Sequence, residues 1–76
     1  MFIKVIGIQL LDFASPSGDH IEGTNIFGGF KDEAVDGLRT EKFFVKKEVE
    51  LPKELKIGDT VNIFFNHKGK VEAISK

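Results

Sequence analysis

Residues 55–74, with the sequence LKIGDTVNIFFNHKGKVEAI, decide the fold class of this chain, because they read as a β-hairpin. Residues 61–65 are β-branched and aromatic, residues 66–69 have the composition of a turn, and residues 70–74 alternate polar with apolar side chains. The preceding Ile57-Gly58-Asp59 is typical of the tight lead-in to a strand of a small barrel. This stretch therefore predicts a small all-β domain.

The sequence before the hairpin predicts three more strands, at residues 2–13, 20–30 and 40–47. Gly7 indicates a bulge or bend in the first of them, and the three glycines of the second indicate a bent or frayed strand. Five short, bent strands in one domain, residues 1–76, predict a five-stranded barrel of OB-like or SH3-like type. The alternation places eight side chains in its core: Ile3, Val5, Val45, Val61, Ile63, Phe65, Val71 and Ile74.

The composition narrows the class of protein. The 76 residues include no cysteine, so neither disulfides nor thiolate chemistry is expected and an intracellular location is the default. Gln9 and Asp12 interrupt the apolar start of the chain, which falls well short of the roughly 20 residues of a membrane span. We expect a soluble, cytoplasmic protein without a membrane partner. The net charge of −1 argues against strong, indiscriminate binding of polyanions.

The third predicted strand carries a pattern suited to single-stranded nucleic acid. With period two, Lys42, Phe44 and Lys46 share one face, so that a ring which can stack on a base is flanked by two ammonium groups that can neutralise phosphates. Phe64 of the fourth strand would extend this surface if the two strands present the same face, and Lys68 and Lys70 flank the final turn. The alternative is that both rings fill a second layer of core, with lysines at its rim.

The glycine-rich second strand and the turn at residues 15–18 suggest a flexible wing that closes over a ligand, with Phe27 as its stacking side chain. In the alternative reading, the glycines let the strand coil round a corner of the barrel and Phe27 belongs to the core.

No catalytic, metal or cofactor motif is found. His20 lies near serines and carboxylates in or beside one predicted turn, which gives no fixed catalytic geometry. His20 and His67 lack the spacing of metal ligands. We therefore expect neither an enzyme nor a metal-binding protein.

The layout resembles the small OB-like single-stranded DNA-binding proteins of filamentous phages. The residues that carry the resemblance are Ile3-Lys4-Val5, Phe13, Ser17-Gly18, Gly23, Phe27 and Ile57-Gly58. The chain departs from that family because its wing has Pro16, His20 and Glu22 in place of arginines, and because it has no tyrosine. The closing hairpin also looks like those of small mobile-element proteins. The resemblance implies an OB-like fold that binds single-stranded DNA.

Two functions from different classes follow. The first is sequence-independent binding of single-stranded DNA or RNA through Phe27, Lys42, Phe44, Lys46, Phe64, Lys68 and Lys70. The second is a protein-interaction module or structural subunit of a phage or conjugative element, which the near-neutral charge and the single arginine favour. The long first strand, apolar on both faces, also predicts a homodimer.

Overall fold

The computed structural model describes all 76 residues, and its regular elements are five strands. These are β1 (Phe2–Ala14), β2 (His20–Lys31), β3 (Leu38–Lys46), β4 (Thr60–Phe65) and β5 (Val71–Ser75). They form one antiparallel sheet in the order β3-β2-β1-β4-β5. The five predicted strands are confirmed, with bounds that differ by one or two residues. The chain has no helix long and apolar enough to cross a membrane.

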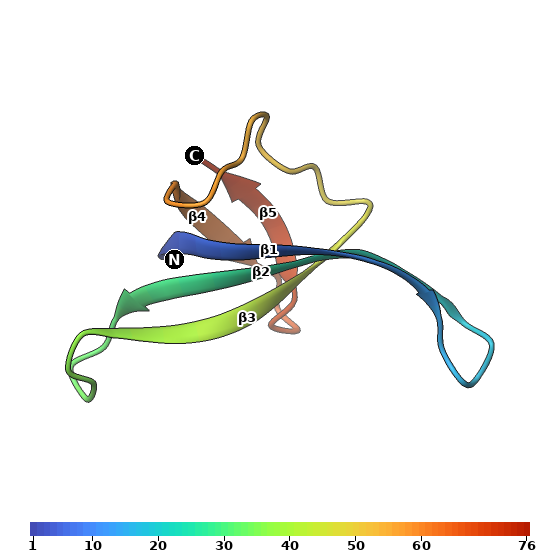
Figure 1. Ribbon diagram of the computed structural model, residues 1–76, viewed down its shortest axis with the longest axis horizontal. Coiled ribbons are helices and arrows are strands. Elements are labelled where there is room, and N and C mark those ends of the chain that lie inside the picture. The colour runs from blue at the N-terminus through green and yellow to red at the C-terminus, as the bar shows by residue number, and fades with distance from the viewer.

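The sheet is bent so that the β4–β5 hairpin crosses behind β1, β2 and β3 (Figure 1). The predicted irregularity at Gly7 is confirmed, because the β1–β2 register shifts between Val5 and Gly7. The ladder between β1 and β4 includes only Phe2, Ile3 and Lys4 of β1, and beyond Val5 that strand pairs with β2 alone. The far end of β1 and the start of β2 therefore project from the body as a two-stranded arm (Figure 1).

The core lies on the concave side of this bend, between the β1–β2–β3 part of the sheet and the β4–β5 hairpin. Its eight buried apolar residues are Ile3, Val5, Ile26, Phe43, Val45, Val61, Ile63 and Ile74. Six of the eight predicted core residues are among them. Phe65 was wrongly placed in the core, since it is 39% exposed, and Val71 only packs against the cluster. Ile26 and Phe43 take their places.

The predicted barrel is only partly right, because the sheet does not close. β3 and β5 are its two edges, and no hydrogen-bonded ladder joins them. The rings of Phe43 on β3 and Phe65 on β4 have centroids 6.1 Å apart, and a hollow lined by Lys42, Phe44 and Lys70 among others separates β3 from the hairpin. At this seam side-chain contacts take the place of a backbone ladder. The architecture is a bent, open, five-stranded antiparallel sheet.

Of the two predicted alternatives for β2, a bent or a frayed strand, fraying is not found. β2 pairs with β1 from His20 to Gly29 and with β3 from Gly23 to Lys31. The position that a Cβ of Gly28 would occupy is taken by the Ile3 side chain, and that of Gly23 by the Phe44 ring and the Val45 carbonyl. These two glycines make room for neighbouring groups and leave the strand continuous.

Candidate functional site: the outer face of β2 and β3

The β2–β3 register brings the predicted stacking and basic residues together. Phe27 is opposite Lys42, Asn25 is opposite Phe44, and Gly23 is opposite Lys46. Directly opposed residues of an antiparallel pair share a face of the sheet. Phe27, Lys42, Phe44 and Lys46 therefore lie on one surface, the convex face that points away from the core, and we call them the β2–β3 face.

Phe44 occupies the centre of this surface. Its Cε1 and Cζ atoms lie 2.8 Å from the position of a Cβ on Gly23, so the ring rests on the glycine backbone of the neighbouring strand. The residue nevertheless remains 40% exposed. A ring supported from below and open to solvent is the arrangement that stacking on a nucleobase requires. The covering of Gly23 also gives the ring a structural role, which a functional test must separate from binding.

Across the open seam between β3 and β5, residues of the β4–β5 hairpin adjoin the β2–β3 face. A hollow of about 230 Å³ separates β3 from the β4–β5 hairpin, and its walls include Lys42, Phe44, Phe65 and Lys70. Lys68 lies in the hairpin turn beside it, which Asn66 stabilises by accepting hydrogen bonds from the backbone N–H groups of Lys68 and Lys70. Phe65, which the sequence assigned to the core, is thus an exposed aromatic wall of the hollow.

Phe27 is a fixed residue of the sheet rather than part of a moving wing. It pairs with Gly7 on β1 and with Lys42 on β3, near the middle of β2. With Ile6 and Lys42 it lines a shallow hollow of about 280 Å³. The wing assignment is therefore wrong for Phe27, because ladders on both sides hold its backbone. The turn at residues 15–19 lies instead at the tip of the projecting arm.

The charges of this surface are available for binding. No ion pair engages Lys42, Lys46, Lys68 or Lys70, whereas Lys47 pairs with Glu22 at 2.9 Å and Lys76 pairs with Asp59 at 3.0 Å. Three carboxylates oppose them: Glu22 and Glu48 line a hollow with Phe44 and Lys46, and Glu41 lines one with Phe27 and Lys42. Glu22 and Glu41 are already paired with Lys47 and Arg39, which leaves Glu48 as the carboxylate here without an ion pair.

Phe64 does not join the group. It is 45% exposed on β4, but β1 and β2 separate β4 from β3 on one side of the sheet, and β5 and the seam separate them on the other. It also lines none of the hollows that Phe44 and the lysines share. The platform of Phe44 and Phe64, expected if the third and fourth strands presented the same face, is therefore not formed.

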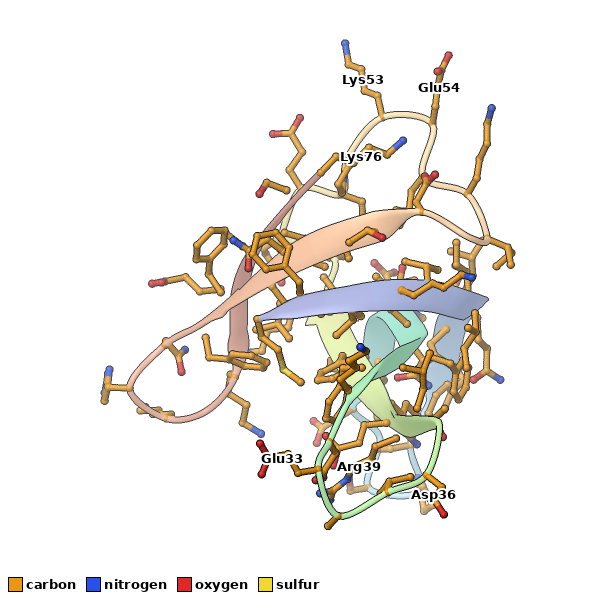
Figure 2. The ribbon with its side chains drawn as sticks, turned by 90° about the vertical axis from the view of Figure 1, so that its left-hand side faces the viewer. Glu33, Asp36, Arg39, Lys53, Glu54 and Lys76 are labelled. Atoms are coloured by element: carbon orange, nitrogen blue, oxygen red, sulfur yellow. The ribbon has the colours of Figure 1, made fainter.

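The loop between β2 and β3, which carries the acidic residues Asp32, Glu33 and Asp36, lies at a different end of the molecule from the charged β3–β4 connection. Figure 2 shows Glu33, Asp36 and Arg39 around the β2–β3 turn, and Lys53, Glu54 and Lys76 at the opposite end. Arg39 donates hydrogen bonds to Asp32 at 3.0 Å and to Glu41 at 3.1 Å. The backbone N–H of Ala34 and the Arg39 guanidinium lower the pKa of Asp32. These contacts organise the turn.

One cluster was not found from the sequence. His20 begins β2, as the strand predicted from residue 20 implies, so the ladder to β1 fixes its backbone. Its Nε2 atom lies 2.5 Å from Asp12 Oδ1 and 3.0 Å from Glu22 Oε1. The register that pairs Asp12 with Glu22 brings these side chains together, and that pairing could be read from the sequence only once the length of the turn was known.

Comparison with protein-family models, with curated proteins and with solved structures finds no match to this chain. These comparisons therefore give no support to the resemblance to the phage DNA-binding proteins.

Proposed function

We propose that the chain is a non-catalytic module that binds single-stranded nucleic acid, without sequence preference, on the β2–β3 face and the adjoining seam. The observation that carries the proposal is the Phe44 ring. It is partly exposed, it rests on the backbone of Gly23, and Lys42 and Lys46, which form no ion pair, flank it. Base stacking on such rings combined with phosphate contacts from lysines is the usual basis of sequence-independent binding.

The strand arrangement supports an OB-like assignment within this proposal. β1 pairs with both β2 and β4, while β3 and β5 approach each other without a ladder. OB-like sheets are five-stranded, partly open barrels that bind oligonucleotides on the face of their second and third strands and with the loop between the fourth and fifth. In this chain the corresponding elements carry Phe27, Lys42, Phe44 and Lys46 on the face, and Lys68 and Lys70 on the loop.

The available charge limits the expected affinity. Four lysines line or flank the site, and Glu48 opposes them. Binding to single strands loses affinity with salt at a logarithmic slope of about −0.7 per neutralised phosphate. We therefore expect a slope of log affinity against log salt concentration between roughly −1 and −3, and an affinity weak enough to be measured by titration.

The test is a ¹⁵N NMR titration with oligo-thymidine, which suits a chain that lacks tryptophan and tyrosine. Amide shifts should concentrate on β2, on β3 and on the β4–β5 turn. The Phe44→Ala variant should lose about 1–3 kcal/mol of binding free energy, the value of one stacked base.

Phe64→Ala is the matched control, because it removes the same side chain, similarly exposed, from outside the site. It should leave the oligonucleotide affinity unchanged. Equal losses in both variants, or no shifts at low salt and high micromolar oligonucleotide, would reject the proposal. Unfolding curves of both variants separate a binding defect from the loss of the cover over Gly23.

A protein-interaction module is the second candidate, and the projecting arm favours it. Leu10 is 81% exposed there and Phe13 is 47% exposed, while the edge of β1 that faces away from β2 is unpaired beyond Val5. An exposed, apolar, unpaired edge is a template for pairing with another chain, including a second copy of this one. Sedimentation equilibrium at micromolar concentration tests the homodimer. A self-association that persists at high salt and is lost in Leu10→Lys would favour this function.

A further inference from the structure

Three side chains with metal-ligating atoms converge on the arm, and two of them, His20 and Glu22, border the hollow that Phe44 also lines. Asp12 and Glu22 are directly opposite each other in the β1–β2 ladder, and His20 precedes Glu22 by two residues on the same strand. All three therefore share a face of the arm. Their ligand atoms all lie within 4.8 Å of one another.

The geometry at His20 goes beyond an ordinary ion pair. Both carboxylates approach the same ring atom, with Nε2 2.5 Å from Asp12 Oδ1 and 3.0 Å from Glu22 Oε1. A ring nitrogen carries at most one hydrogen, so it can direct a strong hydrogen bond to only one of the two oxygens. A cation held between these atoms would accept electron pairs from all three, and would also relieve the repulsion between the directly opposed carboxylates.

We propose that Asp12 Oδ1, His20 Nε2 and Glu22 Oε1 form a binding site for a divalent transition-metal cation of the Zn²⁺ type. One imidazole nitrogen with two carboxylate oxygens suits Zn²⁺, Co²⁺ or Mn²⁺, whereas Ca²⁺ and Mg²⁺ prefer sites built from oxygen alone. Three protein ligands leave at least one coordination position for water. This site adjoins the β2–β3 face, because His20 and Glu22 line one hollow with Phe44 and Lys46, but the proposal does not rest on nucleic-acid binding.

The surroundings of the cluster fit this role. Lys47 donates to Glu22 Oε2 at 2.9 Å, which orients the carboxylate and leaves Oε1 for the cation. A hollow of about 300 Å³ opens beside His20, Glu22, Lys47 and Glu48, with space for bound water and for Glu48 as a further oxygen donor.

The turn that joins the two strands is held independently of the three ligands. The Ser15 backbone N–H donates to the Asp19 carbonyl oxygen at 2.6 Å, and the Ser17 hydroxyl donates to Asp19 Oδ2 at 3.2 Å. These contacts fix the end of the arm before any cation binds. The ladder on one side and the turn on the other thus fix the backbone that carries the three ligands, while the His20 Nε2 and Asp12 Oδ1 atoms, 2.5 Å apart, must separate to admit the cation.

The experiment is a Zn²⁺ titration of the metal-free full chain at pH 7, followed by calorimetry and by the NMR signals of the two histidine rings. His67 is an internal control, because this second histidine lies in the β4–β5 turn and belongs to no such cluster. One Zn²⁺ should bind per chain, and the His20 ring signals should shift at concentrations that leave those of His67 unchanged. Ca²⁺ at the same concentration should leave both rings unaffected.

Variants test each ligand. His20→Ala and Glu22→Gln should each weaken Zn²⁺ binding at least tenfold, about the effect that even outer partners of metal ligands have. His67→Ala should bind Zn²⁺ as the unmodified chain does. Equal shifts of both histidines, an unchanged affinity in His20→Ala, or no binding at millimolar Zn²⁺ would overturn the proposal. Should His20→Ala fail to fold, the comparison of the two rings in the unmodified chain and the Glu22→Gln titration decide the question.

Discussion

Replacing Gly23 with alanine tests the account of how β2 is packed. A Cβ at this position would lie 2.6 Å from the Val45 carbonyl oxygen and 2.8 Å from the Phe44 ring. The ring can rotate away, but the carbonyl belongs to the neighbouring backbone and cannot move without disturbing the ladder. Gly29→Ala is the matched control, because its nearest obstacle is the Cδ1 atom of the half-exposed Leu38, at 3.3 Å.

The two substitutions should change the free energy of unfolding in opposite directions. Overpacking of this kind costs about 1–3 kcal/mol. Alanine in a strand regains about 0.5–1 kcal/mol of the free energy of unfolding relative to glycine. Gly23→Ala should therefore lose roughly 1–2 kcal/mol of stability, whereas Gly29→Ala should be neutral or slightly more stable than the original chain.

Urea unfolding followed by far-UV circular dichroism measures both variants without an aromatic probe. At this chain length each kcal/mol corresponds to a change of about 4–8 °C in the melting temperature. A Gly23→Ala variant as stable as Gly29→Ala would refute the claim that Gly23 is required by close approach of β3. It would also imply that Phe44 does not depend on the glycine for its position.

Two further predictions concern stability. The backbone N–H of Lys56 and the ammonium of Lys76 lower the pKa of Asp59 in the folded chain. The ionised Asp59 therefore stabilises the fold at pH values above the pKa that it has in the unfolded chain. This stabilisation is lost as the pH falls through its lower pKa in the folded chain. Asp59→Asn should therefore be less stable than the original chain at pH 7, and urea midpoints should show the difference shrinking below about pH 4, whereas a difference independent of pH would contradict this. Glu54 has a positive φ of 58°, which costs a non-glycine residue about 1–2 kcal/mol. Glu54→Gly relieves this strain but costs about 0.5–1 kcal/mol, because glycine has more conformational freedom in the unfolded chain. The net effect should be a rise of a few degrees in the melting temperature. A fall in the melting temperature would show that the strain is absent.

The strands could be predicted because their signals are local. The β4–β5 hairpin follows from β-branched and aromatic runs on either side of residues 66–70, and the bulge follows from Gly7 within an apolar strand. The failure of the barrel to close could not be predicted in this way, since it depends on how closely β3 and β5, which are far apart in the sequence, approach each other.

The part of the candidate site that lies on a single strand could be predicted, because side chains alternate between the two faces of a strand. Lys42, Phe44 and Lys46 share a face because they alternate along one strand, and this held. Phe64 was added on the condition that the third and fourth strands present the same face, and the strand order, which places β1 and β2 between them, does not bring Phe64 to Phe44. The cluster at His20 depends on cross-strand register, which only the length of the β1–β2 turn determines.

The pairing of β1 with β4 has a consequence for the synthesis of the chain. β1, β2 and β3 are complete once residue 46 has been made, but the other wall of their core, including Val61, Ile63 and Ile74, comes from the last two strands. At about 5–20 residues per second, the remaining thirty residues take roughly 2–6 seconds.

During that interval the nascent chain presents an uncovered apolar surface that includes Ile26, Phe43 and Val45. Such a surface is a target for chaperones and a starting point for aggregation. Translational pauses within residues 47–60 would prolong this state, and rapid translation through the same segment would shorten it. The codons of the irregular β3–β4 connection should therefore influence soluble yield more than those of either hairpin.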